Sequence, residues 1–270
     1  METDRVTRID SPAMSAILLD VDGVLHVSGH PILGGGKATA RLREAGHHLR
    51  FVTNNTTHSR AALAAEIRSF GVELEDDELQ TTPLAAAHAL KGRRVLALTM
   101  PSIVEDLEGL ELVGENAEAV LLGGADESFE TNRVFSYYNL ARAFAELQDG
   151  AELYCLHKNR WWQTSRGAML DAGAFVAGLE FAAETEAIVL GKPSAAYFAA
   201  ALDALEYEPE ETWIVGDDVE ADLAGAAAFG LRTILVRTGK FREEALEAAT
   251  VRPDGVIDSI AALPDWLELR

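Results

Sequence analysis

Short apolar runs alternate along the chain with longer segments of helical period. Apolar runs stand at 16–19, 48–53 and 94–99, and the segments that follow them repeat apolar residues every three or four positions. The short runs are typical of buried strands, and the longer segments are typical of helices that cover a sheet. The pattern therefore predicts an α/β fold built from βα units around a mostly parallel sheet.

The same pattern predicts a core and an insert. The texture changes near Thr81, where TTPLAAAHAL begins a helix with a proline in its first turn, and the style of the first strands returns at AIVLGKP from Ala187. Within the insert, helical period predicts helices over 132–147 and 168–181. We expect a frayed tail (1–13), a core formed by residues 14–81 and 185–270, and an inserted α/β domain (82–184).

Composition narrows the range of partners. The 270 residues carry a formal net charge of −21, from 44 acids against 23 bases. A surface of this sign repels nucleic acid and anionic membranes, so we expect neither as a partner. Cys155 is the single cysteine, which excludes an intrachain disulfide, and neither a membrane span nor a signal peptide stands out. These features favour a cytoplasmic protein with an acidic surface, such as that of a salt-tolerant organism.

Four polar motifs follow the apolar runs that we expect to be core strands. They are DVDG at 20–23, TNN at 53–55, GKP at 191–193 and GDDVEAD at 216–222. In open α/β sheets, ligands bind outside the carboxyl ends of the strands. The four motifs are therefore expected to converge on one crevice.

The first motif places two carboxylates close together. Asp20 has the chemistry of a nucleophile that forms an aspartyl-phosphate, and Asp22 can protonate the leaving oxygen and later activate water. Gly23 allows the sharp turn that lets both acids face one point. Two carboxylates this close repel each other unless a cation lies between them or one of them is protonated.

The other motifs supply groups for a metal and a phosphate. Asp217 adds an acid, and a hard Mg²⁺ ion held by carboxylates, a carbonyl and waters fits such a set. Donors for the phosphate oxygens are the Thr53 hydroxyl, the Asn54 backbone N–H and the Lys192 ammonium, one of only five lysines in the chain. Residues expected to support the site from beside it are Asn55, Asp218 and Asp222.

Each motif alone also has a structural explanation. DVDG and TNN can be turns in which Asp and Asn accept local backbone hydrogen bonds, GKP can start a helix, and GDD can be a solvated loop. Their occurrence together, each at the end of an expected strand, favours a catalytic site over four unrelated turns.

The order Asp, Thr, Lys, Asp, with an insert before the Lys motif, resembles the haloacid dehalogenase superfamily of phosphotransferases. DVDGVL, VTNN, GKPS and GDDVEAD are similar to its four motifs, and the resemblance covers essentially the whole chain. The place of the insert resembles the class with a type II cap. RFVTNNTTHSR, HKNRWW and VLGKPS resemble the IIA branch, which includes p-nitrophenyl-phosphatase-like enzymes and the subgroup called phospholysine phosphohistidine inorganic pyrophosphate phosphatase.

The resemblance implies a Rossmann-like core with an α/β cap of type IIA. It implies that Asp20 is the nucleophile and a metal ligand, and that Asp22 is the acid/base and binds the metal through its carbonyl. It also implies Asp217 as a metal ligand, and Thr53 and Lys192 as phosphate binders. Two departures stand out: Val24 replaces a frequent Thr, and RGAMLDAGAF replaces a loop that is richer in glycine and proline in many relatives.

One basic and aromatic cluster lies in the insert, in HKNRWW. It can be a strand end with snorkelling cations and surface tryptophans. It can also be a loop that closes over the substrate and contacts the leaving group, which is the interpretation we favour. The residues expected to set specificity are Lys158, Asn159, Arg160 and Trp161.

These features predict a Mg²⁺-dependent phosphatase that hydrolyses a small phosphorylated metabolite through an aspartyl-phosphate. Two alternatives stay open: a receiver-like module that is phosphorylated without turning over a metabolite, and a binding protein with the same fold. Asp22 and the insert favour the enzyme, because a proton donor and a substrate cover are needed only for turnover. By resemblance, caps of this class take part in dimer contacts, so we also expect a homodimer.

Overall fold

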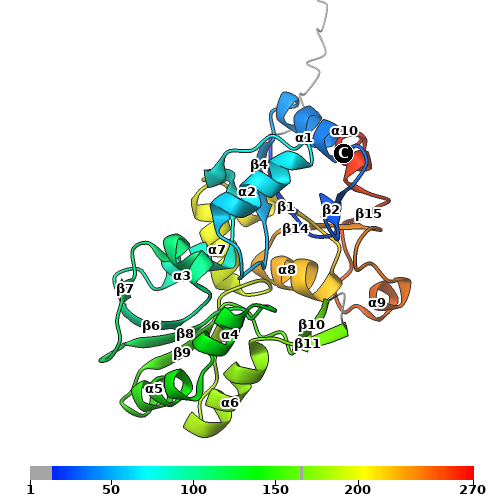
Figure 1. Cartoon of the computed structure of the whole chain (residues 1–270). Coiled ribbons are helices and arrows are strands. Elements are labelled where there is room, and N and C mark those ends of the chain that lie inside the picture. Colours follow the sequence, from blue (N-terminus) through cyan, green and yellow to red (C-terminus); the bar gives the residue numbers. More distant parts are fainter. Residues whose placement is uncertain (1–13, 165–166) are drawn as a thin grey trace, which may run out of the picture.

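A computed structural model describes residues 14–164 and 167–270 of the chain, so the expected tail at 1–13 lies outside the described residues. Two parallel sheets with their covering helices lie one above the other (Figure 1). The larger sheet has six strands in the order β15-β14-β13-β1-β4-β5. Their bounds are Ala16–Asp20 (β1), His48–Val52 (β4), Leu79–Gln80 (β5), Thr212–Gly216 (β13), Arg232–Val236 (β14) and Gly255–Ile257 (β15).

Helices cover both faces of the six-stranded sheet. Ile17 and Leu19 of β1 pack toward α1 (Gly35–Glu44), α2 (Arg60–Ser69) and α10 (Leu263–Glu268). Leu18 faces the other side, where the covering helices are α7 (Ala195–Asp203), α8 (Gly225–Phe229) and α9 (Glu243–Ala248). A strand buried on both faces needs apolar residues at every position, which explains the unbroken run at the start of β1.

The second sheet has five parallel strands in the order β12-β9-β8-β6-β7. The strands are Arg94–Leu98 (β6), Glu111–Leu112 (β7), Ala119–Leu122 (β8), Glu152–Cys155 (β9) and Ile188–Val189 (β12). One face packs on α5 (Tyr137–Gln148) and α6 (Gly173–Ala183), and the other on α3 (Thr82–Ala89) and the 3₁₀ helix η2 (Pro101–Leu107). The α/β class with parallel sheets is confirmed.

One strand belongs to a different sheet than expected. The run at 187–190 was predicted as a core strand, but Ile188 and Val189 pair with Tyr154 and Cys155 of β9 in the five-stranded sheet. Pairing decides the sheet to which so short a strand belongs, and apolar character does not show which partner it takes. The predicted start of the second core segment at residue 185 therefore assigns β12 to the wrong sheet. The other predicted boundaries between core and insert stay predictions.

Two predicted helices also differ from the structure. The helix over 168–181 was wrong at its start: β10 (Trp161–Thr164) and β11 (Gly167–Leu170) are antiparallel, and α6 begins at Gly173. The helix over 132–147 divides into α4 (Phe129–Val134) and α5, because the hydroxyl of Ser136 accepts a hydrogen bond from the Asn139 N–H and begins a new helix.

The remaining short elements connect these layers. They are β2 (His26–Val27), β3 (His30–Pro31), the 3₁₀ helices η1 (Asp76–Glu78), η3 (Pro209–Glu211) and η5 (Ile260–Ala262), and the π-helical turn η4 (Val219–Ala224). Within the described residues, we find no helix with the length and apolar character that crossing a membrane requires.

The two sheets meet at the loop that follows β4. Gly124, beyond the end of β8, lies so close to this loop that an added Cβ would be 1.9 Å from the Thr56 hydroxyl oxygen. His157, beyond the end of β9, is hydrogen-bonded to the same hydroxyl at 3.0 Å. The carboxyl ends of both sheets are thereby brought to one place, where the polar motifs lie.

Candidate active site

Asp20 and Asp217 come from the ends of neighbouring strands. Asp20 is the last residue of β1 and Asp217 directly follows β13, and the two strands are paired in parallel with Leu19 opposite Val215. Gly23 adopts φ +85°, and a Cβ there would lie 1.9 Å from the Asp217 carboxylate. Only glycine therefore permits both the turn after Asp20 and the close approach of Asp217.

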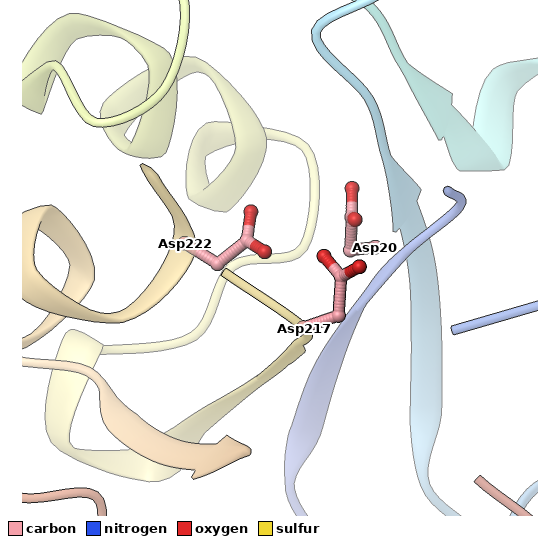
Figure 2. Close-up of side chains that lie close together, drawn as sticks. All are labelled: Asp20, Asp217 and Asp222. Carbon is pink, nitrogen blue, oxygen red and sulfur yellow. The ribbon is translucent and has the colours of Figure 1, made fainter. Parts of the chain in front are cut away.

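Three buried carboxylates converge at this edge, as Figure 2 shows. Asp20, Asp217 and Asp222 each offer an oxygen, and these oxygens all lie within 4.8 Å of one another. All three residues are at most 5% exposed. Asp222 was expected beside the site; its carboxylate is instead part of the cluster, because η4 turns it back toward the strand ends.

Lys192 partly balances this charge. Its ammonium is buried and lies 2.5 Å from Asp20 Oδ1 and 2.7 Å from Asp222 Oδ1. Burial lowers the pKa of Lys192, but the two carboxylates outweigh it and raise that pKa well above its ordinary value. Three carboxylates beside one ammonium leave a net charge of about two negative units when all are ionised.

The electrostatics of the cluster fit a divalent cation. Burial, followed by repulsion from Asp222, raises the pKa of Asp20 well above its ordinary value despite Lys192. Burial also raises the pKa of Asp217 to about 6, although the Lys240 backbone N–H donates a hydrogen bond to it at 2.6 Å. A set of buried oxygen ligands that repel one another is the donor set preferred by Mg²⁺.

Asn54 fixes the loop that carries Lys192. Its side-chain Nδ2 donates to the Lys192 carbonyl at 2.9 Å, and its Oδ1 accepts from the Lys192 N–H at 2.8 Å. The neighbouring Thr53 hydroxyl accepts from the Asn55 N–H, and Asn55 Oδ1 accepts from the N–H groups of Thr57 and His58. The TNN motif thus forms local turns, and it also holds the lysine beside Asp20.

Asp22 lies apart from the three buried carboxylates. Its side chain is 62% exposed and lies 3.4 Å from His26 Nε2. We predicted that both acids of the DVDG motif face one point, and the structure brings only Asp20 into the cluster. Asp218 also has a structural task here, since its Oδ1 accepts from the N–H groups of Glu220 and Ala221 at the start of η4.

A cavity of about 450 Å³ lies between the two sheets beside these residues. Its lining combines Asn54 and Lys192 with Lys158 and Asn159 of the predicted specificity loop. Arg160 and Trp161 are exposed and are absent from the described lining, so the structure brings two of the four predicted cap residues to the cavity. The Lys158 ammonium is paired with Glu180 of α6 at 2.7 Å.

His157 also lines the cavity; it begins the HKNRWW cluster but was not among the four residues expected to set specificity. Its ring is buried: Nε2 lies 3.0 Å from the Thr56 hydroxyl, and Nδ1 accepts from the Asn159 N–H at 3.2 Å. Burial lowers the pKa of His157, and nearby Asp171 offsets this effect in part. The available signal was its position at the start of this cluster, just beyond a buried strand.

Comparisons with known proteins show to which family the chain belongs. A haloacid dehalogenase-like hydrolase family model matches residues 17–113, and a second, described as HAD-hydrolase-like, matches residues 189–263. A phospholysine phosphohistidine inorganic pyrophosphate phosphatase from Xenopus laevis is 36% identical over 261 residues, which cover 93% of this chain and 94% of the relative. The chain belongs to the haloacid dehalogenase-like hydrolase family.

Solved structures support this family assignment. A p-nitrophenyl phosphatase from Archaeoglobus fulgidus superposes with a TM-score of 0.85 at 28% identity, covering 94% of this chain and all of that one. A glycerol phosphate phosphatase from Mycobacterium tuberculosis in complex with magnesium gives a TM-score of 0.81 at 26% identity, covering 93% of this chain and 76% of that one. The chain is therefore a hydrolase of a family whose named neighbours are phosphatases, as its four motifs predict.

Proposed function

We propose that this haloacid dehalogenase-like hydrolase is a Mg²⁺-dependent phosphatase that acts on a small phosphorylated metabolite through an aspartyl-phosphate. The observation that carries the proposal is the buried Asp20 carboxylate, ion-paired with Lys192 and beside Asp217 and Asp222. The nucleophile, the Lys192 ammonium and an excess of negative charge that a metal can balance therefore lie together at the carboxyl ends of the core strands. The small cavity next to them supports a substrate of metabolite size.

Asp20, Asp217 and the Asp22 backbone carbonyl would hold the metal. When bound, Mg²⁺ would neutralise the charge of the carboxylates and of the phosphate oxygens, so that an anionic substrate can approach an anionic nucleophile. Asp222 stays beside this set, where it holds Lys192. The magnesium complex of the M. tuberculosis neighbour supports this choice of ion.

The reaction needs two proton transfers, which we assign to Asp22. In the first step an Asp20 oxygen attacks phosphorus, the bond to the leaving oxygen breaks, and that oxygen takes the proton of Asp22. In the second step Asp22 takes a proton from a water that attacks the phosphorus, and the bond to Asp20 breaks to release phosphate. The exposed Asp22 side chain must rotate toward the cavity for both transfers.

Three donors would hold the phosphate oxygens. The Lys192 ammonium already lies against the nucleophile, and the Thr53 hydroxyl and the Asn54 backbone N–H lie on the loop that Asn54 ties to Lys192. In the described part of the chain, the Asn54 N–H donates to no other group, which leaves it available for a ligand. Donors placed before the reaction stabilise the charge of the transition state at little reorganisation cost.

Phosphate release from a panel of phosphorylated compounds tests this function. The names of the relatives supply the first members: inorganic pyrophosphate, phospholysine, phosphohistidine, glycerol phosphate and p-nitrophenyl phosphate. We expect turnover with Mg²⁺, none with excess chelator, and none for Asp20→Asn. Absence of turnover for every compound would refute the proposal. A stable phosphoenzyme without release would support the phosphoacceptor alternative instead.

Location and assembly remain proposals as well. We propose a cytoplasmic enzyme that pairs with a second copy of itself and takes neither nucleic acid nor membrane as a partner. The acidic composition supports the last part, because net charge of this size repels polyanions. Light scattering across a concentration series tests the dimer, and a mass that stays at that of one chain would contradict it.

A further inference from the structure

Some of the charged side chains in the described lining of the cavity are paired with an opposite charge, and others are not. Besides the buried ring of His157, the described lining contains four residues of the Lys, Asp and Glu types: Lys158, Lys192, Asp218 and Glu220. Both lysines have acidic partners, since Lys158 pairs with Glu180 and Lys192 with Asp20 and Asp222. No described lysine or arginine is therefore left unpaired in the lining to bind a second anionic group of a substrate.

The two acidic residues of the described lining, Asp218 and Glu220, differ in whether their carboxylates have partners. Asp218 accepts two backbone hydrogen bonds through Oδ1, and its Oδ2 lies 3.8 Å from the Lys240 ammonium. For Glu220, the structure gives a hydrogen bond at the backbone N–H and, among the described residues, no partner for its carboxylate. Glu220 thus places on the cavity wall a negative charge that no described residue pairs with.

The phosphate position and the rest of the cavity therefore differ in charge. Beside Asp20, Lys192 and a metal would attract the phosphate, whereas the rest of the lining combines Lys158, which is paired with Glu180, and the neutral groups of Asn159 and Ser194 with the Glu220 carboxylate, which has no described partner. Glu220 lies two residues after the capping residue Asp218, and the hydrogen bond from its backbone N–H to Asp218 Oδ1 fixes its backbone at this wall. An additional carboxylate on the leaving group would meet this charge without a compensating cation.

We infer that Glu220 selects phosphomonoesters whose leaving group is neutral or bears an amine, and disfavours those with a second anionic group. The inference rests on the proposed phosphatase function and adds a substrate class to it. Glu220 acts as a specificity residue because its charge, at the cavity wall, attracts or repels charges on the leaving group. For partly exposed charges at such a site, we expect a preference of about fivefold for each unit of charge on the leaving group.

Three two-carbon phosphomonoesters of nearly equal size test this inference. O-phosphoethanolamine has a cationic leaving group at neutral pH, 2-hydroxyethyl phosphate a neutral one, and phosphoglycolate an anionic one. We expect kcat/KM to fall in that order, and the spread to shrink at high KCl because salt screens exposed charges. These measurements use the wild-type enzyme, so they decide the question even where a variant is unstable. Phosphoglycolate as the best of the three would overturn the inference.

Variants at Glu220 separate its effect from that of the whole acidic surface. We expect Glu220→Gln to reduce the ratio of kcat/KM for phosphoethanolamine over phosphoglycolate by about threefold or more, and Glu220→Lys to invert the order. The control Glu66→Gln removes the same charge from an exposed position on α2 and should keep the wild-type ratio. A wild-type ratio in Glu220→Gln would contradict the inference while turnover still upholds the phosphatase. No turnover of any phosphate ester, including p-nitrophenyl phosphate, would refute both.

Discussion

Asn54 holds Lys192 through a reciprocal pair of hydrogen bonds, one to its carbonyl oxygen and one from its backbone N–H. The two residues are far apart in sequence, and the pair joins the loop after β4 to the loop before α7. The Lys192 ammonium extends from this junction to Asp20. The position of the cation beside the nucleophile therefore depends on a neutral amide that does not itself touch the carboxylates.

Asn54→Ala should weaken both activity and stability. The substitution leaves the Lys192 carbonyl and N–H without these partners, at a cost of about 1–3 kcal/mol in the free energy of unfolding. We expect kcat/KM to fall by about tenfold or more, because a small displacement of a positioned donor is costly. Chemical denaturation and steady-state kinetics measure the two effects. Asn132→Ala, at an exposed position on α4, is the matched control and should resemble the wild type.

Lys192→Met should destabilise the metal-free protein more than any surface lysine substitution. Without the ammonium, Asp20, Asp217 and Asp222 repel one another in a buried site, and removing one partner of a buried ion pair typically costs about 3–5 kcal/mol. Because a divalent cation replaces part of the lost charge, added Mg²⁺ should raise the melting temperature of the variant. Lys37→Met, at an exposed position of α1, serves as the control. Equal melting temperatures for the two variants would contradict the electrostatic account.

Magnesium binding should release protons near pH 6, because burial raises the pKa of Asp217 to about 6. An acid with a raised pKa in the folded state holds its proton there longer than in the unfolded chain. Its contribution to stability is therefore present at low pH and is lost as pH rises from about 4 to about 6. Mg²⁺ binds the deprotonated form, so its affinity should rise over the same range.

Calorimetry in two buffers of different ionisation enthalpy counts the released protons. We expect uptake of Mg²⁺ at pH 6 to release a fraction of a proton, and at pH 8 to release almost none from this group. The melting temperature with Mg²⁺, compared with that in chelator, should rise more at pH 8 than at pH 5. Asp217→Asn should lose the part of the proton release near pH 6 that comes from this carboxyl, whereas release from Asp20, whose pKa burial also raises, would remain. Proton release of equal size at pH 6 and pH 8 would exclude Asp217 as its source.

The parts of the site that could be predicted from the sequence are those at strand ends. Asp20, Lys192 and Asp217 follow apolar runs, and the geometry of a parallel sheet brings the ends of its strands together whatever the details of packing. Asp222 could be placed only near the site, since the π-helical turn that directs its carboxylate into the cluster leaves no clear pattern in the sequence.

The other wrong predictions concern features that tertiary packing determines. The two residues of β12 are too short a run to show which sheet they join, and β10 and β11 share apolar character with the helix that follows them. The directions of Asp22 and Arg160 depend on side-chain rotamers, which sequence spacing does not determine. Glu220 lies within the GDDVEAD motif, but sequence spacing could not show its role, which comes from its place in the cavity lining and from the absence of a described partner for its carboxylate.

The last prediction concerns His157 and Thr56, whose side chains join the two sheets at the cavity. The neutral ring accepts from the Asn159 N–H at Nδ1, so Nε2 carries the proton and donates it to the Thr56 hydroxyl. His157→Ala and Thr56→Val should each raise KM for substrates that reach the cap, whereas inhibition by orthovanadate, which occupies only the phosphate position, should change little. Because both substitutions break one contact, their effects on KM should be less than additive in the double variant.

Thr56→Ser keeps the hydroxyl and should restore most of the wild-type KM, which separates the hydrogen bond from general packing. Hydrogen exchange gives a second measure that needs no substrate: the Asn159 amide should exchange faster in His157→Ala, since its acceptor at Nδ1 is lost. Fully additive effects, together with unchanged exchange at Asn159, would show that His157 merely fills space between the sheets. The less-than-additive result would make this contact the means by which the phosphate-binding loop fixes the position of the loop that covers the leaving group.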